Sequence, residues 1–361
     1  MTMVKVIVVV VMMISILFSM PKCLQAINIG QLRHLINRKN MTCILVFGDS
    51  SVDPGNNNFL ATTLKSNFPP YGKDFFDSRP TGRFCNGRLA TDFIAEALGH
   101  TKIISGFLDR HLTQENLLHG VSFASAGSGY DYLTANFSNV LSFSRQIKYF
   151  MHYKLHLGRL VGEKKAEEII QHAIYILSMG TNDFVQNYFL EPTRPKQYSL
   201  EGYLNYLATC ITNDIKTLHR LGAMQFVLVG VPPLGCMPLV KTLTGTTGCA
   251  DSYNKASFSF NSKVRNLLTD IGTSLGVKTA YVDTYAIFER TMSNPTRYGF
   301  TETSKGCCGS GTIEVGETCR GMSTCKDPSK YIFWDSVHPT EHMYRIIANE
   351  ALRTVSQKIL A

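Results

Sequence analysis

The hydrophobic pattern of the chain alternates between short apolar runs and longer amphipathic stretches. Runs without polar alternation are typical of strands covered on both faces, whereas an apolar stripe with helical periodicity is typical of surface helices. The pattern predicts five strands, at Cys43–Phe47, Val121–Ala124, Ala173–Met179, Phe226–Val231 and Val277–Val282. It predicts helices at Leu89–Leu98, Ser142–Leu157, Leu200–Leu221, Ser252–Leu275 and Glu341–Val355.

This alternation of strands and helices predicts a three-layer α/β/α fold, in which helices cover both faces of a parallel sheet. Five parallel strands suit the flavodoxin-like strand order 2-1-3-4-5. Two stretches rich in Gly, Pro and Asn, residues 48–88 and 294–330, interrupt the pattern as long loops. Long loops in a compact domain are usually lids or binding loops. Because no linker divides the chain, we expect a single domain.

The first residues have the features of a secretory signal peptide. Lys5 provides a positive charge, and the 13 residues of Val6–Phe18 form an apolar run shorter than the ~20 residues that span a bilayer. The small residue Ala26 marks the expected cleavage site. We therefore expect a signal peptide at residues 1–26, one mature domain at residues 27–361, no membrane span and an extracellular location.

Cysteine usage fits an oxidising compartment. Ten cysteines are present, nine of them after the signal peptide, so at least one thiol is expected to stay free. Four cysteines of a Gly-rich segment lack the paired Cys-x2–4-Cys spacing of structural zinc sites and are expected to form disulfides: Cys307, Cys308, Cys319 and Cys325. Cys236 and Cys249 could close another short loop, and Cys43 is the candidate free thiol. We expect no metal and no other cofactor.

Charge and sequons limit the class of partner. The formal net charge is +9, and the basic residues are scattered, with no Lys/Arg-rich run that carries interleaved aromatic residues. Nucleic acid is therefore not an expected partner, whereas a weak, salt-sensitive attraction to acidic polysaccharide is compatible with the charge. Asn40 and Asn136 begin N-x-[ST] sequons and are candidate glycosylation sites of a secreted chain.

Four short clusters fall where predicted strands end or where the last helix begins. They are Ser50, Gly127-Ser128-Gly129, Gly180-Thr181-Asn182-Asp183 and Asp335-Ser336-Val337-His338-Pro339. Open α/β sheets bind their ligands at the carboxyl ends of the strands. We therefore expect these clusters to share one rim of the sheet.

Three of these residues have the chemistry that acyl transfer requires. A serine hydroxyl needs a neighbouring base, histidine titrates near neutrality, and a carboxylate holds the imidazole in the correct tautomer. The spacing of Asp335 and His338 would let one turn of chain bring them together. Pro339 is expected as the first residue of the last helix, with Glu341 in its first turn.

A tetrahedral oxyanion also needs hydrogen-bond donors. Gly127 allows a backbone N–H to approach closely, the side-chain amide of Asn182 could supply another donor, and the Ser50 N–H a third. Each cluster also has a structural interpretation. Gly127 could only serve a turn, Asn182 could cap a helix, and Asp335 could be a helix N-cap.

Gly272-Thr273-Ser274-Leu275-Gly276 matches the G-x-S-x-G nucleophile elbow. That elbow follows a strand and precedes a helix. Here the helical pattern comes first and the strand second, so we interpret Ser274 as part of a helix-to-strand turn.

Taken together, these clusters resemble the GDSL esterase/lipase family of plants, within the SGNH hydrolase superfamily. The resemblance runs over nearly the whole mature chain. The segments that carry it are Phe47-Gly48-Asp49-Ser50, Pro70-Tyr71-Gly72, Thr81-Gly82-Arg83-Phe84, Phe123–Gly129, Gly180–Asp183, Pro232–Cys236, Cys307-Cys308-Gly309 and Phe333–Pro339.

The resemblance implies an SGNH hydrolase fold, Ser50 as nucleophile, His338 as base, Asp335 as its orienting carboxylate, and Gly127 and Asn182 as oxyanion donors. One departure is Ser51, where the family name expects leucine, and there we expect a change in packing. Pro54 is a second departure, at a position where asparagine is more usual.

The leading hypothesis is a secreted serine esterase or lipase that hydrolyses carboxylic esters through an acyl-enzyme. An acyltransferase that uses the same residues is an alternative, and so is a non-catalytic wall-binding protein on the same fold. Fatty acyl lipids, acetylated polysaccharides and small phenolic esters all stay open as substrates.

Overall fold

The computed structural model describes residues 29–41 and 43–360, so the expected signal peptide lies outside the described residues. The central element of this part of the chain is a six-stranded parallel sheet with the order β2-β3-β1-β4-β5-β6. Its strands are β1 (Ile44–Gly48), β2 (Ser105–Gly106), β3 (Gly120–Ser122), β4 (Ile174–Ser178), β5 (Gln225–Val229) and β6 (Lys278–Val282).

The predicted sheet is confirmed with one addition. The five expected strands are present and, without β2, lie in the order that the pattern predicts. The additional strand β2 contains only two residues and pairs at the edge with β3. So short a strand has no alternation of its own, and it could not be predicted from periodicity.

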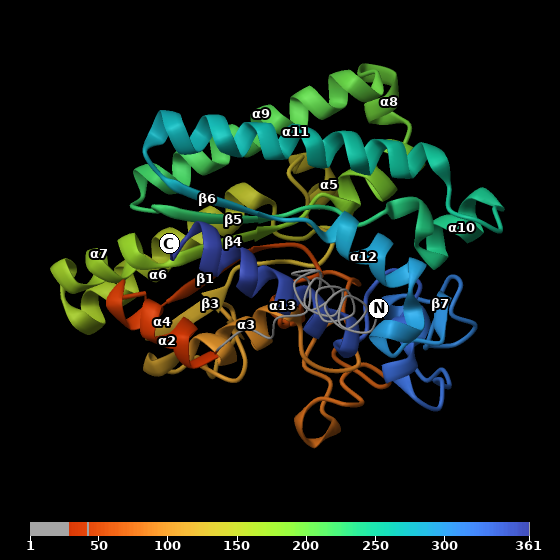
Figure 1. Ribbon diagram of the computed structural model, residues 1–361, viewed down its shortest axis with the longest axis horizontal. Coiled ribbons are helices and arrows are strands. Elements are labelled where there is room, and N and C mark those ends of the chain that lie inside the picture. Colours follow the sequence, from red (N-terminus) through yellow and green to blue (C-terminus); the bar gives the residue numbers. More distant parts are fainter. Residues whose placement is uncertain (1–28, 42, 361) are drawn as a thin grey trace, which may run out of the picture.

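Helices cover both faces of the sheet (Figure 1). On one face α9 (Leu200–Arg220) packs against α11 (Asp251–Leu275), and on the other α3 (Ala90–Leu98) packs against α13 (Glu341–Lys358). The sheet is thus the middle layer of an α/β/α arrangement. The remaining helices are α2 (Ile29–Arg38), α4 (Gln114–His119), α5 (Tyr132–Phe137), α6 (Phe143–Val161), α7 (Glu163–His172), α8 (Thr193–Gln197), α10 (Pro238–Thr244) and α12 (Thr284–Ser293).

Strand β1 lies at the centre of the core. All five of its residues are buried, and the ring centroid of Phe47 lies 5.0 Å from that of Phe123 and 5.9 Å from that of Phe150. Burying one such side chain stabilises the fold by roughly 1.5–3 kcal/mol. This packing fixes the strand whose carboxyl end leads directly to Ser50.

The start of the last helix differs from the prediction. Helix α13 begins at Glu341, and the Thr340 hydroxyl caps it by accepting a hydrogen bond from the Met343 N–H. Pro339 instead forms an isolated antiparallel bridge with Phe333. The expectation that Pro339 opens the helix is therefore wrong, because the threonine cap comes one residue later.

The segment that follows α12 returns to the sheet edge through a small second sheet. Strands β7 (Glu302–Gly306) and β8 (Tyr331–Phe333) pair in parallel, and between them lies a loop closed by disulfides. The bridges are Cys307–Cys325 and Cys308–Cys319, and Cys236–Cys249 closes a separate loop. These pairs confirm that the clustered cysteines form disulfides. Cys43 is a free, buried thiol, as expected, and Cys85 and Cys210 are free as well.

The loop after β1 is fastened to α3 by a buried ion pair. Arg83 lies in this loop, and its Nη2 is 2.9 Å from Oδ1 of Asp92 in the first turn of α3. The other oxygen of Asp92 accepts a hydrogen bond from the Leu89 N–H at the start of that helix. One carboxylate thus orders both the helix N-terminus and the loop that carries Tyr71 and Phe84.

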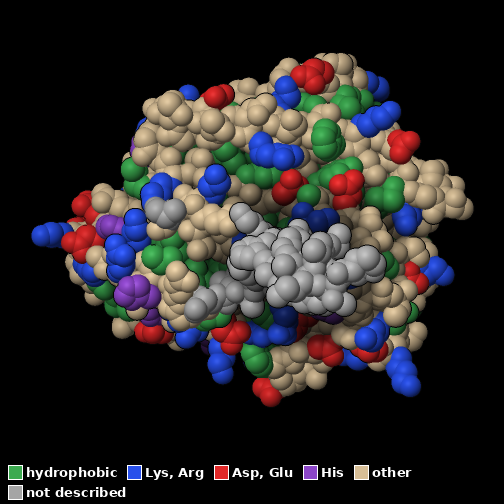
Figure 2. Space-filling model, viewed as in Figure 1, with side chains coloured by type: hydrophobic (Ala, Val, Ile, Leu, Met, Phe, Trp, Pro, Cys, Tyr) green, Lys and Arg blue, Asp and Glu red, His purple; other side chains and the backbone are tan. Residues whose placement is uncertain are grey.

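Charged side chains of both signs are interspersed on the face shown in Figure 2. The Lys and Arg side chains on this face do not gather into one continuous patch.

Candidate active site

Ser50 lies just beyond the carboxyl end of β1. Its Oγ is 2.8 Å from Nε2 of His338, a residue 288 positions away in the chain. The tight turn after β1 needs a glycine at position 48, because a Cβ there would collide with the carbonyl oxygen of Ser178 on the neighbouring strand. The central strand therefore delivers the Ser50 hydroxyl to the rim of the sheet.

Asp335 contacts the opposite side of the His338 ring. The Nδ1 of His338 is 2.8 Å from Oδ2 and 3.0 Å from Oδ1 of Asp335, and both side chains are buried. Asp335 Oδ1 also accepts the backbone N–H groups of Val337 and His338. The structure thus places the carboxylate, imidazole and hydroxyl in one line of hydrogen bonds. Asp335 is not the helix N-cap, since that position is occupied by Thr340.

Tyr71 also holds Asp335, and sequence reasoning assigned it no role. Its hydroxyl donates a 2.8 Å hydrogen bond to Asp335 Oδ2 and accepts one from the Gly316 N–H at 2.7 Å. The side chain is 1% exposed. The ring of Phe84, from the same loop, lies 4.9 Å from the His338 ring. In the sequence, Tyr71 stood out only as part of the Pro70-Tyr71-Gly72 segment of the family resemblance. That segment did not indicate which residue Tyr71 contacts.

Gly127 and Asn182 belong to two loops that are tied together. Asn182 Nδ2 donates a 2.9 Å hydrogen bond to the carbonyl oxygen of Ser128, next to Gly127. Gly127 has a φ of 85°, and a Cβ there would clash with Leu64. Asn182 precedes the π-helix η4 (Asp183–Leu190), but its side chain makes no capping hydrogen bond. Its amide therefore bridges to the glycine loop, and one amide hydrogen stays available for another acceptor.

Asp183 fixes the relation between these two loops. Its carboxylate accepts hydrogen bonds from the Tyr130 N–H at 2.8 Å, the Asp131 N–H at 3.1 Å and the Thr134 hydroxyl at 2.6 Å. Burial raises the pKa of Asp183 to about 7, and the nearby charge of Asp131 acts in the same direction, although these hydrogen bonds lower it. The Asp183 carboxylate thus links the segment that follows Gly127 to the segment that contains Asn182.

An asparagine pair also supports the strand that leads to Gly127. Asn56 Nδ2 donates to the carbonyl oxygens of Ser122 and Ala124, and Asn57 Nδ2 donates to that of Ala126. In the structure Asn56 and Asn57 hold the backbone between β3 and Gly127 in place.

The two residues that flank Ser50 form their own hydrogen-bond network. Asp49 Oδ1 accepts bonds from the Ser51 N–H at 2.9 Å and the Ser51 hydroxyl at 2.7 Å. Burial raises the pKa of Asp49 in spite of these bonds. Ser51 Oγ also lies 2.9 Å from the hydroxyl of Ser178 on β4. Serine at position 51 therefore anchors the nucleophile turn to the sheet through polar contacts.

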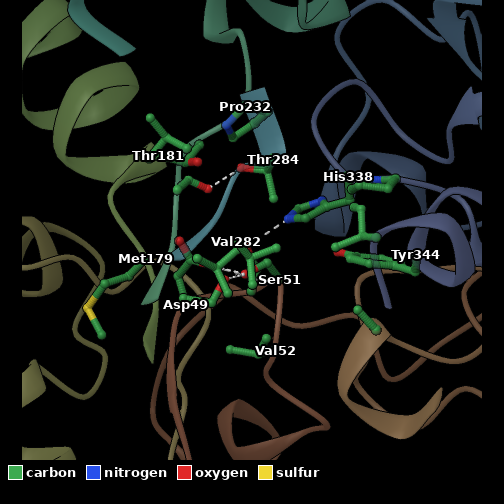
Figure 3. A pocket seen from close by; sticks show the side chains of 18 of the residues that line it. Asp49, Ser51, Val52, Met179, Thr181, Pro232, Val282, Thr284, His338 and Tyr344 are labelled. Atoms are coloured by element: carbon green, nitrogen blue, oxygen red, sulfur yellow. Dashed lines mark hydrogen bonds between the residues drawn. The ribbon is translucent and has the colours of Figure 1, made fainter. Parts of the chain in front are cut away.

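A mainly apolar cavity of about 90 Å³ opens beside Ser50. It extends between the sheet and the helices α3 and α13, and Ser50, Ser51 and His338 are among the residues that line it. Figure 3 shows the His338 ring directed toward the side of the cavity where Asp49 and Ser51 lie. Gly127 and Asn182 do not line this cavity.

Ser274 of the second serine motif is remote from these groups. It lies in the last turn of α11, and its hydroxyl bonds to the carbonyl oxygen of Ile271 in the same helix. The helix precedes β6, as the order of the patterns predicts. This motif therefore forms no nucleophile elbow.

The described residues contain no group of three or more His, Cys, Asp or Glu side chains placed to hold a metal ion. None of their helices combines the length and apolar character needed to cross a membrane.

A parallel α/β/α sheet with serine, histidine and carboxylate in contact at its carboxyl edge has the arrangement that nucleophilic hydrolases use. The family model of the GDSL-like lipase/acylhydrolases matches residues 44–351. The chain therefore belongs to the GDSL-like lipase/acylhydrolase family, and this membership supports a hydrolase activity.

Individual relatives agree with this assignment. GDSL esterase/lipase At5g45950 of Arabidopsis thaliana is 53% identical over 335 residues, which cover 93% of this chain and 94% of that protein. GDSL esterase/lipase At2g04570 of the same plant is 42% identical over 316 residues, covering 86% and 90%. The alignment with a solved lipase from a goat rumen metagenome covers 89% of this chain and 100% of that chain. The sequence identity is 12% and the TM-score is 0.41, which are too low to support a comparison of function.

Proposed function

We propose that this protein is a secreted serine esterase that hydrolyses carboxylic ester bonds through an acyl-enzyme on Ser50. The observation that carries the proposal is the continuous pair of hydrogen bonds from Ser50 Oγ to His338 Nε2 and from His338 Nδ1 to Asp335 Oδ2, each 2.8 Å long. Family membership supports the same class of reaction.

In the first half-reaction, Ser50 Oγ attacks the ester carbonyl carbon while His338 Nε2 accepts its proton. Asp335 keeps the Nδ1 proton on the far side of the ring and stabilises the imidazolium that forms. The carbonyl oxygen of the substrate becomes an oxyanion, and the proposed donors are the N–H groups of Ser50 and Gly127 and the side-chain amide of Asn182. Each such donor stabilises the transition state by ~3–4 kcal/mol.

The first half-reaction ends when the tetrahedral intermediate collapses. His338 Nε2 then donates its proton to the leaving alcohol, and the acyl group stays on Ser50 Oγ. A water molecule then attacks the acyl-enzyme, and His338 accepts its proton before returning one to Ser50 Oγ. An alcohol that takes the place of water would give acyl transfer from the same intermediate. Product analysis with an added alcohol distinguishes the two reactions.

The experiment that tests the function is hydrolysis of a short p-nitrophenyl ester by matched serine variants. Ser50→Ala should lower kcat by at least about 10⁴-fold, because members of such a triad act as a unit. Ser274→Ala removes the serine of the alternative motif and should retain full activity. Full activity of Ser50→Ala, or loss of activity in Ser274→Ala, would contradict the assignment.

Secretion is part of the proposal and is supported by three disulfides within the described residues and by two sequons. Both Asn40 and Asn136 are exposed, and Asn136 lies in α5. We expect the full chain to be released from eukaryotic cells as a protein that begins at Ile27. Recovery of the unprocessed chain inside the cells, with mobility unchanged by an amidase that removes N-glycans, would contradict this part.

A further inference from the structure

The cavity beside Ser50 has walls suited to hydrocarbon. Its apolar lining comes from the sheet and from the helix layer that contains α3 and α13. It includes Ile176, Val229 and Val282 of the sheet, Ile94 of α3, and Ile347 and Ala351 of α13. Ser50 and His338, the proposed nucleophile and base, also line it. A substrate bonded to Ser50 Oγ can therefore direct one of its two halves into this cavity.

The chemistry of the acyl-enzyme indicates which half. The acyl group stays bonded to Ser50 Oγ through both half-reactions, whereas the alcohol must leave and water must enter. A partly enclosed apolar cavity between the sheet and α13 suits the group that stays, because the acyl group leaves only as the acid product, after water has hydrolysed the acyl-enzyme. Gly127 and Asn182 are absent from the cavity lining, so the proposed oxyanion donors leave it open to the rest of the acyl chain.

The size of the cavity limits the acyl group. Its volume is about 90 Å³. An apolar cavity of about 150 Å³ in another protein accommodates benzene, which has six carbon atoms. By this comparison the cavity accepts about four carbon atoms.

Ser51 contributes to the available space. It lines the cavity, and Figure 3 shows it near the centre of this group of side chains. The name of the GDSL-like family gives leucine at this position of the motif, and this chain has a serine. A serine side chain is smaller than leucine by two carbon atoms or more, so the substitution leaves room next to Ser50.

Tyr344 gives a second, independent indication that the cavity receives a ligand. This residue of α13 lines the cavity, it is 3% exposed, and its hydroxyl has no hydrogen-bond partner among the described residues. A buried hydroxyl without a partner is unfavourable, and a ligand oxygen in the cavity can satisfy it. Burial is also the largest of the effects that raise the Tyr344 pKa, so its hydroxyl stays a donor.

On these grounds, and resting on the proposed function, we propose that the cavity binds the acyl group of the ester and limits it to about four carbon atoms. The substrate class is thus esters of short carboxylic acids, of the acetyl to butyryl range. A hydroxyl or keto oxygen on such an acyl chain provides the acceptor for Tyr344.

The test is a series of p-nitrophenyl esters from acetate to decanoate, with kcat/KM measured for the native protein and two variants. The native protein should hydrolyse butyrate at least ten-fold more efficiently than octanoate. Ser51→Leu fills the cavity and should lower the ratio of butyrate to acetate hydrolysis at least ten-fold. Ser51→Ala removes the same hydroxyl without filling the space, and its butyrate-to-acetate ratio should stay near the native value.

A native protein that hydrolyses octanoate as efficiently as butyrate would overturn the proposal, as would an unchanged ratio in Ser51→Leu. If that variant does not fold, Ala351→Leu fills the cavity from α13 and must give the same change in ratio. The role of Tyr344 is supported if the native protein prefers the 3-hydroxybutyrate ester over the butyrate ester and Tyr344→Phe loses this preference. It is contradicted if the native protein hydrolyses both esters equally well. Failure of the proposed function looks different, because then no ester in the series is hydrolysed by the native protein.

Discussion

At the scale of single residues, the position of Asp335 depends on its own segment and on two other parts of the chain, which contain Tyr71 and Gly316. Its own segment supplies two backbone N–H donors, Tyr71 supplies a hydroxyl, and Gly316 holds that hydroxyl from the other side. The imidazole can keep its orientation toward Ser50 only if this carboxylate is fixed. Tyr71 is therefore a positioning residue for the proposed base.

Removing the Tyr71 hydroxyl should weaken catalysis without removing a group that touches substrate. A hydrogen bond to a charged group contributes about 1.5–3 kcal/mol, so Tyr71→Phe should lower kcat about 10- to 100-fold. KM should change little, and the pH dependence of kcat should shift, because the carboxylate that stabilises the imidazolium has lost a partner.

The matched control is Tyr175→Phe. Tyr175 is equally buried, but its hydroxyl bonds to the carbonyl oxygen of Ile170, and neither residue is part of the site. This variant should keep the native kcat and pH profile. Equal losses of kcat in the two variants would show that Tyr71 acts through stability alone.

Some of the site could be predicted from single residues, and some could not. Ser50, Asp335 and His338 were predictable because their side chains have the required chemistry and stand at ends of periodic elements. Tyr71 was not, since its contact with Asp335 joins residues 264 positions apart and no local pattern reports it. The contact of Ser51 with Ser178 was missed for the same reason, since these residues are 127 positions apart.

At the scale of elements, the disulfide-closed loop between β7 and β8 supports the site directly. This loop contains Gly316, whose N–H holds the Tyr71 hydroxyl, and the N–H of Cys307 donates to the carbonyl oxygen of Trp334 next to Asp335. The bridge Cys307–Cys325 encloses a separation of 18 residues. The order of this loop and the position of Asp335 are therefore coupled.

Removing this bridge should cost both stability and activity. Replacing Cys307 and Cys325 by serine should lower the free energy of unfolding by about 3 kcal/mol, the value for a loop of this length. Activity should fall as well, because the loop that fixes Tyr71 gains freedom. Chemical denaturation and ester hydrolysis measure the two effects.

A second pair of cysteines provides the comparison. Cys236 and Cys249 are 13 positions apart, and the loop between them contacts Asp335 only indirectly, through a hydrogen bond from the Leu239 N–H to the carbonyl oxygen of Ser336. Replacing both by serine should lower stability by a similar amount with a smaller loss of activity. If activity is unaffected by the loss of Cys307–Cys325, the proposed coupling is wrong.

The longest helices were predictable, whereas three helices of 10 residues, α2, α7 and α12, were missed. The five helices and five strands found from periodicity all occur, with ends shifted by a few residues. The short strand β2 and the pair β7 and β8 were missed, because strands of two to five residues without an apolar run carry no periodic signal. The predicted start of the last helix at Pro339 failed because a stronger cap, Thr340, follows it.

At the scale of the whole molecule, one partly buried histidine, His100, should make stability depend on pH. His100 follows α3, its ring lies 5.8 Å from that of His119, and its Nε2 has no hydrogen-bond partner among the described residues. Burial lowers the pKa of His100 from 6.5 to about 4, and the His119 charge acts in the same direction. The folded protein therefore favours the neutral ring.

The sign of the effect follows from this shift. Because the folded-state pKa lies below the unfolded one, the contribution of His100 is fully present above pH 6.5 and is lost as the pH falls toward 4. The loss is about 3 kcal/mol at most. His100→Phe should reduce the acid-induced fall in the free energy of unfolding between these pH values, measured by chemical denaturation.

The exposed His111 provides the control. His111→Gln should leave the pH dependence of stability unchanged. If the acid-induced fall in the free energy of unfolding is the same in His100→Phe as in the native protein, His100 does not cause that fall.

The whole arrangement depends on a hydroxyl and a base from opposite ends of the chain meeting at one edge of the sheet. The most direct test is to treat the folded protein with a fluorophosphonate and locate the modified residue by peptide mass spectrometry. We expect one phosphonylated serine, Ser50, and no labelling in His338→Ala. Labelling of Ser274 or another serine, or unchanged labelling of Ser50 without His338, would contradict the central claim.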